Sequence, residues 1–480
     1  MADTFLAYWK RKTRGFSPSR DIQSCDTRGM PQTDLTQGHV PLSLARLTAP
    51  MMMGVSSSVL VQVLEMGFIG QLSTAHVAAI TFTFPLTMVL TSIALGISIG
   101  TSSVIARSVG QHSQSQDGGD DVQRLGTHSL ILVTGAMSVL AALCWLSIDP
   151  IFLALGADKA MLPLIHSYLD VYLPGSIFFT IAMILGSIMR ANGSATVPGV
   201  IMTAGSIAHL LLDPILIFGW FGLPAMELQG AATAMTVTRF AVMIMTLIYV
   251  FRGQMVLNHD HLRAFVSSSK RILHVGIPAI ATNLIGPVTA AYITRLMANY
   301  GETAVAGFGV AGRIEAVAAM LMFALSGSIG PFVGQNLGAK KLHRVHLGVT
   351  ASYQFSLAWG LLVALPLFFF GDAISGLIDS SPEVIAIAAL YLALVPWSYG
   401  CWGMLMMATA SFNAVGKPLP STALSFTRMV VIYVPLASLL DHLYGYQGIF
   451  IATLISNTLL GIVAYLWFRT QLSNMAQAHS

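Results

Sequence analysis

Long apolar segments, each about the length of a bilayer crossing, constrain this chain more than any other feature. A spanning helix needs about 20 mainly apolar residues. Because lipid offers the backbone no hydrogen-bond partner, we expect every such segment to be a helix. The predicted spans are residues 47–69, 80–107, 127–147, 163–189, 195–219, 229–251, 272–297, 305–334, 346–370, 385–411, 418–440 and 446–468.

The scarcity of charge supports a membrane location. Only 9% of the residues are charged, whereas a soluble domain carries roughly 25%, so most of the surface must face lipid. The apolar runs are long and continuous, unlike the short alternating strands of an outer-membrane barrel. The sequence therefore predicts an all-α polytopic membrane protein with twelve transmembrane helices.

Lysine and arginine orient the predicted helices. They gather in the tail up to Arg46 and in alternate loops, while the opposite loops hold only Lys159. Basic loops stay in the cytoplasm, so we expect both termini to be cytoplasmic and the protein to lie in the cell inner membrane. The basic residues form no stripe or helix face, and nucleic-acid binding is not expected.

The two halves of the chain resemble each other. Residues 72–79 align with residues 300–307, and Gly193 aligns with Gly416 at nearly the same offset. Six spans in each half give equal topology, which predicts two pseudo-symmetric six-helix bundles related by an axis along the membrane normal. Transporters built in this way place substrate between the bundles and rock them to alternate access.

The expected domains follow from these spans. They are a cytoplasmic tail at 1–46, a first lobe at 47–251, a linker at 252–271, a second lobe at 272–469 and a C-terminal tail at 470–480. We expect the N-terminal tail to be loosely ordered. A short amphipathic surface helix around residues 5–9 is an alternative interpretation of the tail.

Two acidic residues inside spans of the first half are candidates for ion coupling. Glu65 and Asp213 each lie about four residues, or about 6 Å, before the outer end of an outward-running span. Ionisable groups in a membrane are costly and mark functional sites, and two buried carboxylates close together favour binding a proton. The alternative is that each acid only hydrogen-bonds a neighbouring helix.

Histidine 209 is the third candidate for ion coupling. It lies four residues before Asp213, on the same helix face, and histidine exchanges a proton near neutral pH. A hydrogen-bonded packing role is an equally good interpretation of this residue.

Other residues are assigned to a substrate cavity or to structure. Asp170 is expected at the outer mouth of the same cavity, and further cavity candidates are Tyr168, Met183 and Thr233. In the second half, Arg313 and Glu315 do not face each other because they are two residues apart. We expect a structural clamp there, with Arg295 as the candidate partner of Glu315.

Several motifs resemble the MATE (multidrug and toxic compound extrusion) family. Glu65–Gly70, followed by two alanines, is similar to the end of that family's first helix, and Leu212–Gly219 is similar to its fifth. Gly312–Glu315 and Val333–Ala339 are similar to its helix 8 signature. The similarity covers nearly everything after residue 40, and the DinF-like branch fits better than the NorM-like branch.

This resemblance implies export of organic cations against a proton or sodium gradient, with coupling carboxylates at Glu65 and Asp213. It also implies that protonation bends the first helix, for which Pro50 and Gly54 are candidate flex points. The family usually has aspartate at position 65 and asparagine at position 209. Loss of a neutral oxygen ligand at His209 weakens the case for sodium, because hard cations prefer oxygen.

We therefore expect a secondary antiporter that exports amphipathic or cationic compounds in exchange for protons, with sodium as the other candidate ion. A flippase for a lipid-linked substrate of the same superfamily is the alternative. The sequence has no Walker phosphate-binding loop, so we do not expect transport driven by ATP. The spans show no His/Glu metal pattern and no nucleophile–base spacing, so we expect no enzyme activity. We also expect no cofactor, no resident metal ion, small organic molecules as partners, and a monomer.

Overall fold

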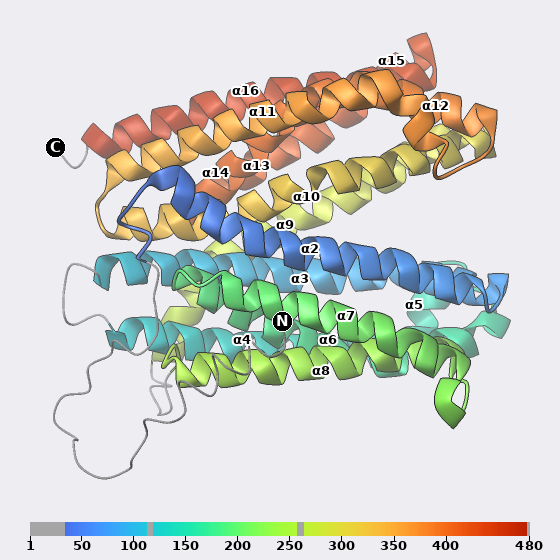
Figure 1. Ribbon diagram of the computed structural model, residues 1–480, viewed down its shortest axis with the longest axis horizontal. Coiled ribbons are helices and arrows are strands. Elements are labelled where there is room, and N and C mark those ends of the chain that lie inside the picture. The colour runs from blue at the N-terminus through green and yellow to red at the C-terminus, as the bar shows by residue number, and fades with distance from the viewer. Residues whose placement is uncertain (1–33, 113–118, 257–263, 478–480) are drawn as a thin grey trace. The chain divides into compact units, whose positions relative to one another are not determined.

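The computed structural model describes residues 34–112, 119–256 and 264–477. Within these ranges all of its regular secondary structure is helical, and twelve of its helical segments are long and apolar enough to cross a membrane. The predicted all-α class and the number of spans are confirmed for this part of the chain. Figure 1 shows the helices lying side by side along one common direction.

Helices of the first half form one bundle, in which α6 packs against α3, α4 and α8, and α7 packs against α2 and α8. Their bounds are α2 Val40–Gly70, α3 Thr74–His112, α4 Gly119–Leu146, α5 Ile148–Ala154, α6 Leu162–Ala191, α7 Thr196–Phe218 and α8 Glu227–Arg252.

Helices of the second half form the other bundle, in which α13 packs against α10, α11, α14 and α16. Their bounds are α9 Phe265–Ala298, α10 Glu302–Gly338, α11 Leu342–Ser375, α12 Pro382–Leu394, α13 Tyr399–Ala414, α14 Pro418–Phe426, α15 Val434–Tyr444 and α16 Tyr446–Gln477. Two spans consist of consecutive helices: α12 reaches α13 through a 3₁₀ turn at Val395–Ser398, and α14 reaches α15 through a π-helix at Thr427–Tyr433.

The repeat seen in the sequence has a structural counterpart in two turns. Gly193 follows the end of α6 and Gly416 follows the end of α13, and both have a positive φ, of 86° and 78°. A helix often ends on such a left-handed residue, and glycine adopts that conformation without steric cost. The aligned glycines therefore terminate corresponding helices of the two halves.

The helices extend beyond the predicted apolar runs. A helix satisfies its own backbone hydrogen bonds and so continues into polar residues that a hydropathy pattern excludes. Helix α2 begins at Val40, with a proline in its first turn, so residues 40–46 of the predicted tail are helical. The predicted C-terminal tail is also helical up to Gln477, and α9 begins at Phe265, inside the predicted linker at 252–271.

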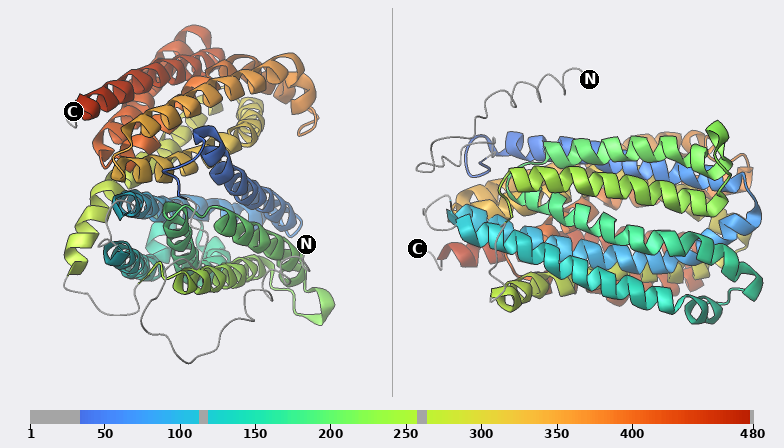
Figure 2. Two further views of the ribbon diagram at one scale, coloured as in Figure 1. Left: turned by 60° about the vertical axis from the view of Figure 1, so that its left-hand side comes forward. Right: turned by 90° about the horizontal axis from the view of Figure 1, so that it is seen from below.

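The residues before α2 and its first turns pack against the second half. Leu35, Val40 and Leu44 belong to one buried cluster with residues of α10, α11, α13, α14 and α16. Further along, α2 packs against α7 of the first half. Figure 2 shows α2, in dark blue, between the two sets of helices. One helix therefore connects the cores of both halves.

The halves meet closely at one end, which we call the basic end because it carries Arg190, Lys341 and Lys417. There the Arg107 guanidinium donates a hydrogen bond of 2.7 Å to the carbonyl of Ala414. The Gln335 amide donates one of 2.7 Å to the carbonyl of Ala191. These contacts join the last turns of helices from different halves.

Small residues allow α3 and α9 to approach each other near the same end. A Cβ atom at Gly96 would lie 2.7 Å from the backbone nitrogen of Ile280, and one at Gly100 would lie 2.4 Å from the carbonyl oxygen of Ile272. Close packing of this kind drives helix association where lipid removes the hydrophobic effect.

Candidate functional site

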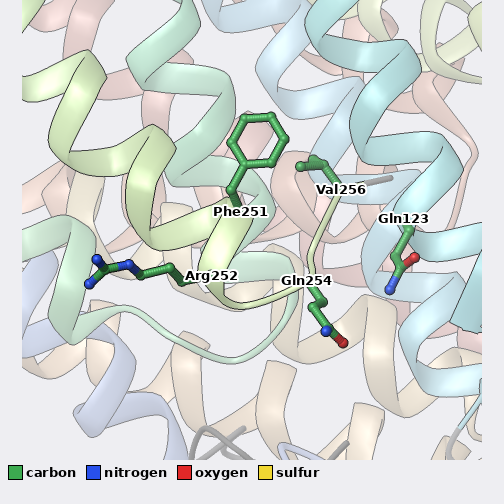
Figure 3. Close-up of a pocket in the computed structure, with 5 residues that line it drawn as sticks. All are labelled: Gln123, Phe251, Arg252, Gln254 and Val256. Atoms are coloured by element: carbon green, nitrogen blue, oxygen red, sulfur yellow. The ribbon is translucent and has the colours of Figure 1, made fainter. Parts of the chain in front are cut away.

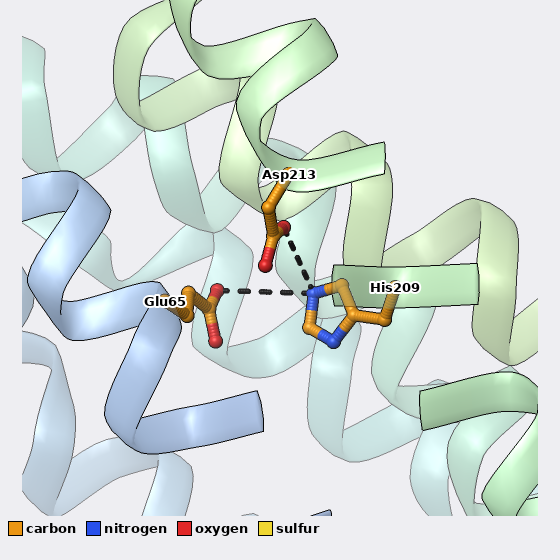
Figure 4. Close-up of side chains that lie close together, drawn as sticks. All are labelled: Glu65, His209 and Asp213. Atoms are coloured by element: carbon orange, nitrogen blue, oxygen red, sulfur yellow. Dashed lines mark ion pairs between the residues drawn. The ribbon is translucent and has the colours of Figure 1, made fainter. Parts of the chain in front are cut away.

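Glu65, His209 and Asp213 form a compact group that we call the acid–histidine cluster (Figure 4). Glu65 lies on α2, and the other two residues lie one turn apart on α7. The Nε2 atom of His209 is 3.2 Å from Oδ1 of Asp213 and 4.0 Å from Oε1 of Glu65. The structure therefore brings the three predicted coupling residues together.

The cluster is buried, and four of its polar atoms make no hydrogen bond in the described part of the chain. Asp213 is 0% exposed and Glu65 is 6% exposed, and the side chain of His209 is 12% exposed. Within the described residues, Oε1 of Glu65, Nε2 of His209 and both carboxylate oxygens of Asp213 make no hydrogen bond. Buried polar atoms are normally paired, so this arrangement favours the uptake of a proton or a metal ion.

Close packing of α2 against α7 positions the cluster. A Cβ atom at Gly199 would lie 2.4 Å from the carbonyl oxygen of Pro50, and one at Gly54 would lie 3.2 Å from Cβ of Met202. One turn further along, the hydroxyl groups of Ser58 and Ser206 are 3.3 Å apart. The two helices run parallel in this register, which carries Glu65 to the level of Asp213.

Pro50 and Gly54, the predicted flex points, are thus contact positions between α2 and α7. Helix α2 is one continuous element from Val40 to Gly70 with Pro50 inside it. Proline removes one backbone hydrogen bond from a helix interior, and this makes Pro50 the weakest point of the backbone of α2. Its role in bending stays a prediction.

Arg239 on α8 is a charged neighbour to which the sequence analysis gave no role. Its guanidinium lies 5.1 Å from the ring centroid of Tyr172 and 4.7 Å from that of Phe179. Its Nη1 atom is buried without a hydrogen-bond partner among the described residues, and its charge acts on Glu65. The sequence does contain a signal for this residue, because Arg239 is an arginine within an apolar span.

Tyr168 lies beside the cluster, and its assignment to a substrate cavity stays a prediction. Its buried ring stacks on Tyr172 at 5.4 Å, and its phenol interacts electrostatically with Glu65, Asp213 and Arg239. The two tyrosines and Arg239 form the polar and aromatic surroundings of the cluster on the side of α6 and α8.

None of the described contacts joins Asp170 to the acid–histidine cluster, and its place at the outer mouth of the cavity stays a prediction. It is exposed, and its carboxylate accepts a hydrogen bond of 3.0 Å from the indole of Trp145 on α4. His166 lies 3.4 Å from the same oxygen and also pairs with Asp149. Residues two apart point to opposite sides of a helix, and Tyr168 already occupies the face toward Glu65.

Met183 and Thr233 are half-buried residues of α6 and α8. The hydroxyl of Thr233 donates a hydrogen bond of 2.7 Å to the carbonyl of Gln229 within its own helix. Among the described contacts, none joins either residue to the acid–histidine cluster. Their assignment to a substrate cavity stays a prediction.

The second half contains a polar group around Glu315, but its predicted partner is wrong. The carboxylate of Glu315 accepts hydrogen bonds from the hydroxyl groups of Tyr391, at 2.6 Å, and Tyr399, at 3.1 Å. The nearby cation is Arg428 rather than Arg295.

Arg295 and Arg313 are both exposed, so they do not complete the predicted clamp with Glu315. Arg428 belongs to the π-helix and donates a hydrogen bond of 2.6 Å to the side chain of Asn457. The clamp around Glu315 therefore consists of two tyrosines and an arginine from α12, α13 and the π-helix, which are distant in sequence.

A pocket of about 570 Å³ lies at the basic end, away from the cluster. It is lined by Gln123 of α4 and by Phe251, Arg252, Gln254 and Val256 at and after the end of α8 (Figure 3). None of these residues belongs to the predicted substrate cavity, so this pocket is not the candidate site.

The family model that matches this chain is MatE, over residues 50–215 and 278–439. The first segment contains the whole acid–histidine cluster, and the second contains Glu315. The two segments correspond to the two halves predicted from the internal repeat.

Similar proteins match over nearly the whole chain. A FAD transporter of Shewanella oneidensis is 32% identical over 428 residues, which is 88% of this chain and 93% of the relative. The multidrug export protein MepA of Staphylococcus aureus is 24% identical over 429 residues, 88% of this chain and 92% of the relative.

A solved structure has the same fold. The crystal structure of the Vibrio cholerae MATE transporter VcmN in the bent form superposes with a TM-score of 0.85 at 29% identity. The match covers 91% of this chain and 97% of that chain.

Proposed function

Because this chain belongs to the MATE family of membrane transporters, we propose that it is a secondary antiporter that exports amphipathic, often cationic compounds in exchange for protons. The observation that carries the proposal is the acid–histidine cluster. Two buried carboxylates beside a histidine, with unpaired polar atoms, are suited to bind and release a cation as the surroundings change.

Helix α2 supplies the mechanical link in this proposal. Its first turns pack in the core of the second half, while Glu65 near its other end faces α7 of the first half. Proton uptake removes the repulsion between Glu65 and Asp213 and changes how α2 packs against α7. Because α2 also holds the second half, this change alters the balance between the two open states of the transporter.

The proposed orientation follows the positive-inside rule. The basic end, with Arg190, Lys341 and Lys417, faces the cytoplasm, and the protein works as a monomer in the inner membrane. Contacts between Arg107 and Ala414 and between Gln335 and Ala191 close this cytoplasmic end. The other end is then the one from which substrate leaves.

Protons are the proposed coupling ion rather than sodium. Sodium is a hard cation that prefers oxygen ligands, and the imidazole of His209 offers nitrogen next to Asp213. Histidine instead exchanges protons near neutral pH.

The test is efflux of a fluorescent cationic drug from proteoliposomes under an imposed proton gradient or an imposed sodium gradient, applied separately. We expect efflux under the proton gradient alone. Efflux driven by sodium alone would refute the ion assignment, and no efflux under either gradient would refute coupled export of that compound.

A second candidate substrate class is a flavin dinucleotide, favoured by the identity to the FAD transporter. Such a molecule combines a planar aromatic ring with a negatively charged diphosphate. Arg239, with its free Nη1 atom beside Tyr172 and Phe179, offers a cation and aromatic faces in one place. This is also the feature nearest to what a flippase for a lipid-linked phosphate would need.

Vesicles loaded with FAD distinguish the candidates, since flavin fluorescence outside the vesicles reports export directly. If FAD is a substrate, Arg239→Gln lowers FAD export more than it lowers export of a cationic drug. Equal loss of both activities would argue against anion recognition by Arg239. If a lipid-linked phosphate inhibits export of the cationic drug and free FAD does not, the result favours the flippase.

A further inference from the structure

We propose that Glu65, His209 and Asp213 form a binding site for a divalent transition-metal ion, represented by Zn²⁺, which competes with the coupling proton. The inference rests on the proposed function only in naming the proton as competitor, because metal binding is measurable without transport. It extends the expected role of these residues from proton exchange to selective metal binding.

The geometry of the donor atoms suits a small metal ion. One ligand atom from each of the three residues lies within 4.8 Å of the other two. Bonds of about 2.0–2.1 Å to zinc place neighbouring ligand atoms of a tetrahedron about 3.3 Å apart. The pair His209 and Asp213 is already at 3.2 Å, and Glu65 lies at 4.0 Å from the imidazole.

A side-chain adjustment by Glu65 of about 0.7 Å would bring its oxygen to the tetrahedral ligand spacing from the imidazole of His209. Glutamate has one more methylene group than aspartate, which gives it the freedom for this movement. Three protein ligands leave the fourth corner to a water molecule.

The unpaired polar atoms supply an independent reason for the site. Asp213 is 0% exposed, and neither of its oxygens has a hydrogen-bond partner among the described residues. Oε1 of Glu65 and Nε2 of His209 are also unpaired, and all three side chains point toward a common centre in Figure 4. A metal ion at that centre satisfies one ligand atom of each of the three side chains at once.

The donor set selects the class of metal. One imidazole nitrogen with two carboxylate oxygens suits zinc and its first-row neighbours, whereas calcium and magnesium take oxygen ligands alone. The wild-type cluster is therefore expected to discriminate against Na⁺, Ca²⁺ and Mg²⁺ and in favour of Zn²⁺ and Co²⁺.

Charge near the site sets both its affinity and its pH dependence. The two carboxylates neutralise a dication, while Arg239 from α8 adds an opposing positive charge. Tyr168 of α6 also interacts electrostatically with Glu65 and Asp213, and Tyr172 stacks on Tyr168 and contacts Arg239. Metal ligands must lose their protons to bind, so the affinity for zinc rises with pH and binding releases protons.

The test uses tag-free, full-length protein in detergent, titrated with Zn²⁺ by calorimetry and with Co²⁺ by visible absorption. We expect one bound ion per chain. The absorption spectrum should be that of Co²⁺ with a low coordination number. Both His209→Asn and Asp213→Asn should weaken binding at least about tenfold. The matched control is His166→Asn, which removes an exposed histidine that also pairs with two aspartates and should leave affinity unchanged.

Arg239→Gln provides a test in the opposite direction. Removing the opposing charge should tighten zinc binding several-fold, which loss of folding would not do. The proposal is overturned if wild type and His209→Asn bind zinc equally, or if His166→Asn is the variant that loses it. It is also overturned if Arg239→Gln weakens binding while the protein keeps its elution volume and melting temperature.

Transport assays separate this inference from the proposed function. Zinc should inhibit proton-driven efflux, less strongly at lower pH. Zinc binding that depends on His209, in a protein with no proton-driven efflux, would support the metal site and refute the coupling. Proton-driven efflux in a protein that does not bind zinc would refute the metal site alone.

Discussion

Asp213 and His209 lie one turn apart on α7 with 3.2 Å between Oδ1 and Nε2, yet neither atom makes a hydrogen bond within the described residues. The carboxylate is completely buried. A charged group held in this way is stabilised mainly by whatever cation it shares with its neighbours. This pair, with Glu65 opposite, is therefore a place where cation binding changes the contact between α2 and α7.

Replacement of Asp213 tests the coupling role. Asp213→Asn keeps the size of the side chain but removes the charge that attracts a proton, and we expect proton-driven efflux to fall at least about tenfold. The measurement is drug efflux from proteoliposomes after a pH jump. Asp170→Asn is the matched control, because Asp170 is an exposed aspartate of the same half. Undiminished coupled efflux by Asp213→Asn would remove that residue from the mechanism.

The contact between α2 and α7 gives a second prediction. In Gly199→Ala, the new Cβ atom would lie 2.4 Å from the carbonyl oxygen of Pro50, and overpacking of this kind costs about 1–3 kcal/mol. The helices must separate, which draws Glu65 away from Asp213. We expect a lower melting temperature together with weaker proton coupling.

Gly135→Ala on α4 is the control for this effect, because a Cβ atom there meets nothing within 4 Å. Alanine in place of a helical glycine should instead stabilise by about 0.5–1 kcal/mol. Equal effects of the two substitutions on coupling would contradict the assigned role of the α2–α7 contact.

Glu315 gives a prediction about stability rather than ion coupling. Glu315→Ala removes the acceptor of the Tyr391 and Tyr399 hydroxyl groups, and an unsatisfied buried donor costs about 1–3 kcal/mol. Glu315→Gln retains an acceptor oxygen and should lose much less. Thermal unfolding in detergent separates the two variants. A glutamine variant as unstable as the alanine variant would show that charge, not hydrogen bonding, matters.

Arg344 gives a prediction about closure of the basic end. Its guanidinium donates hydrogen bonds to the carbonyl oxygens of Gly38, Gln37 and Leu35, at 2.7, 2.9 and 3.2 Å. Charge-assisted hydrogen bonds contribute about 1.5–3 kcal/mol each, so Arg344→Ala should speed local opening at least about tenfold.

Hydrogen–deuterium exchange of the segment before α2 measures this opening, and Arg469→Ala is the control. Arg469 is exposed, and the bond described for it joins the Tyr465 hydroxyl of its own helix. Unchanged exchange at Leu35 in Arg344→Ala would mean that hydrophobic burial alone holds the segment.

The sequence by itself determined the helical architecture. Twelve apolar runs fixed the spans because an unpaired backbone is too costly in lipid. The four-residue spacing placed His209 and Asp213 on one face of α7, and the repeat aligned Gly193 with Gly416.

Only the tertiary structure decided which faces meet. Glu65 reaches Asp213 because glycines bring α2 against α7, whereas Asp170 points to Trp145 and Glu315 to two tyrosines. Lipid and the protein interior are both apolar, so the polarity of a membrane helix does not indicate which of its sides packs against another helix. The position of Arg239 beside the cluster depends on the same packing, so only the tertiary structure shows it.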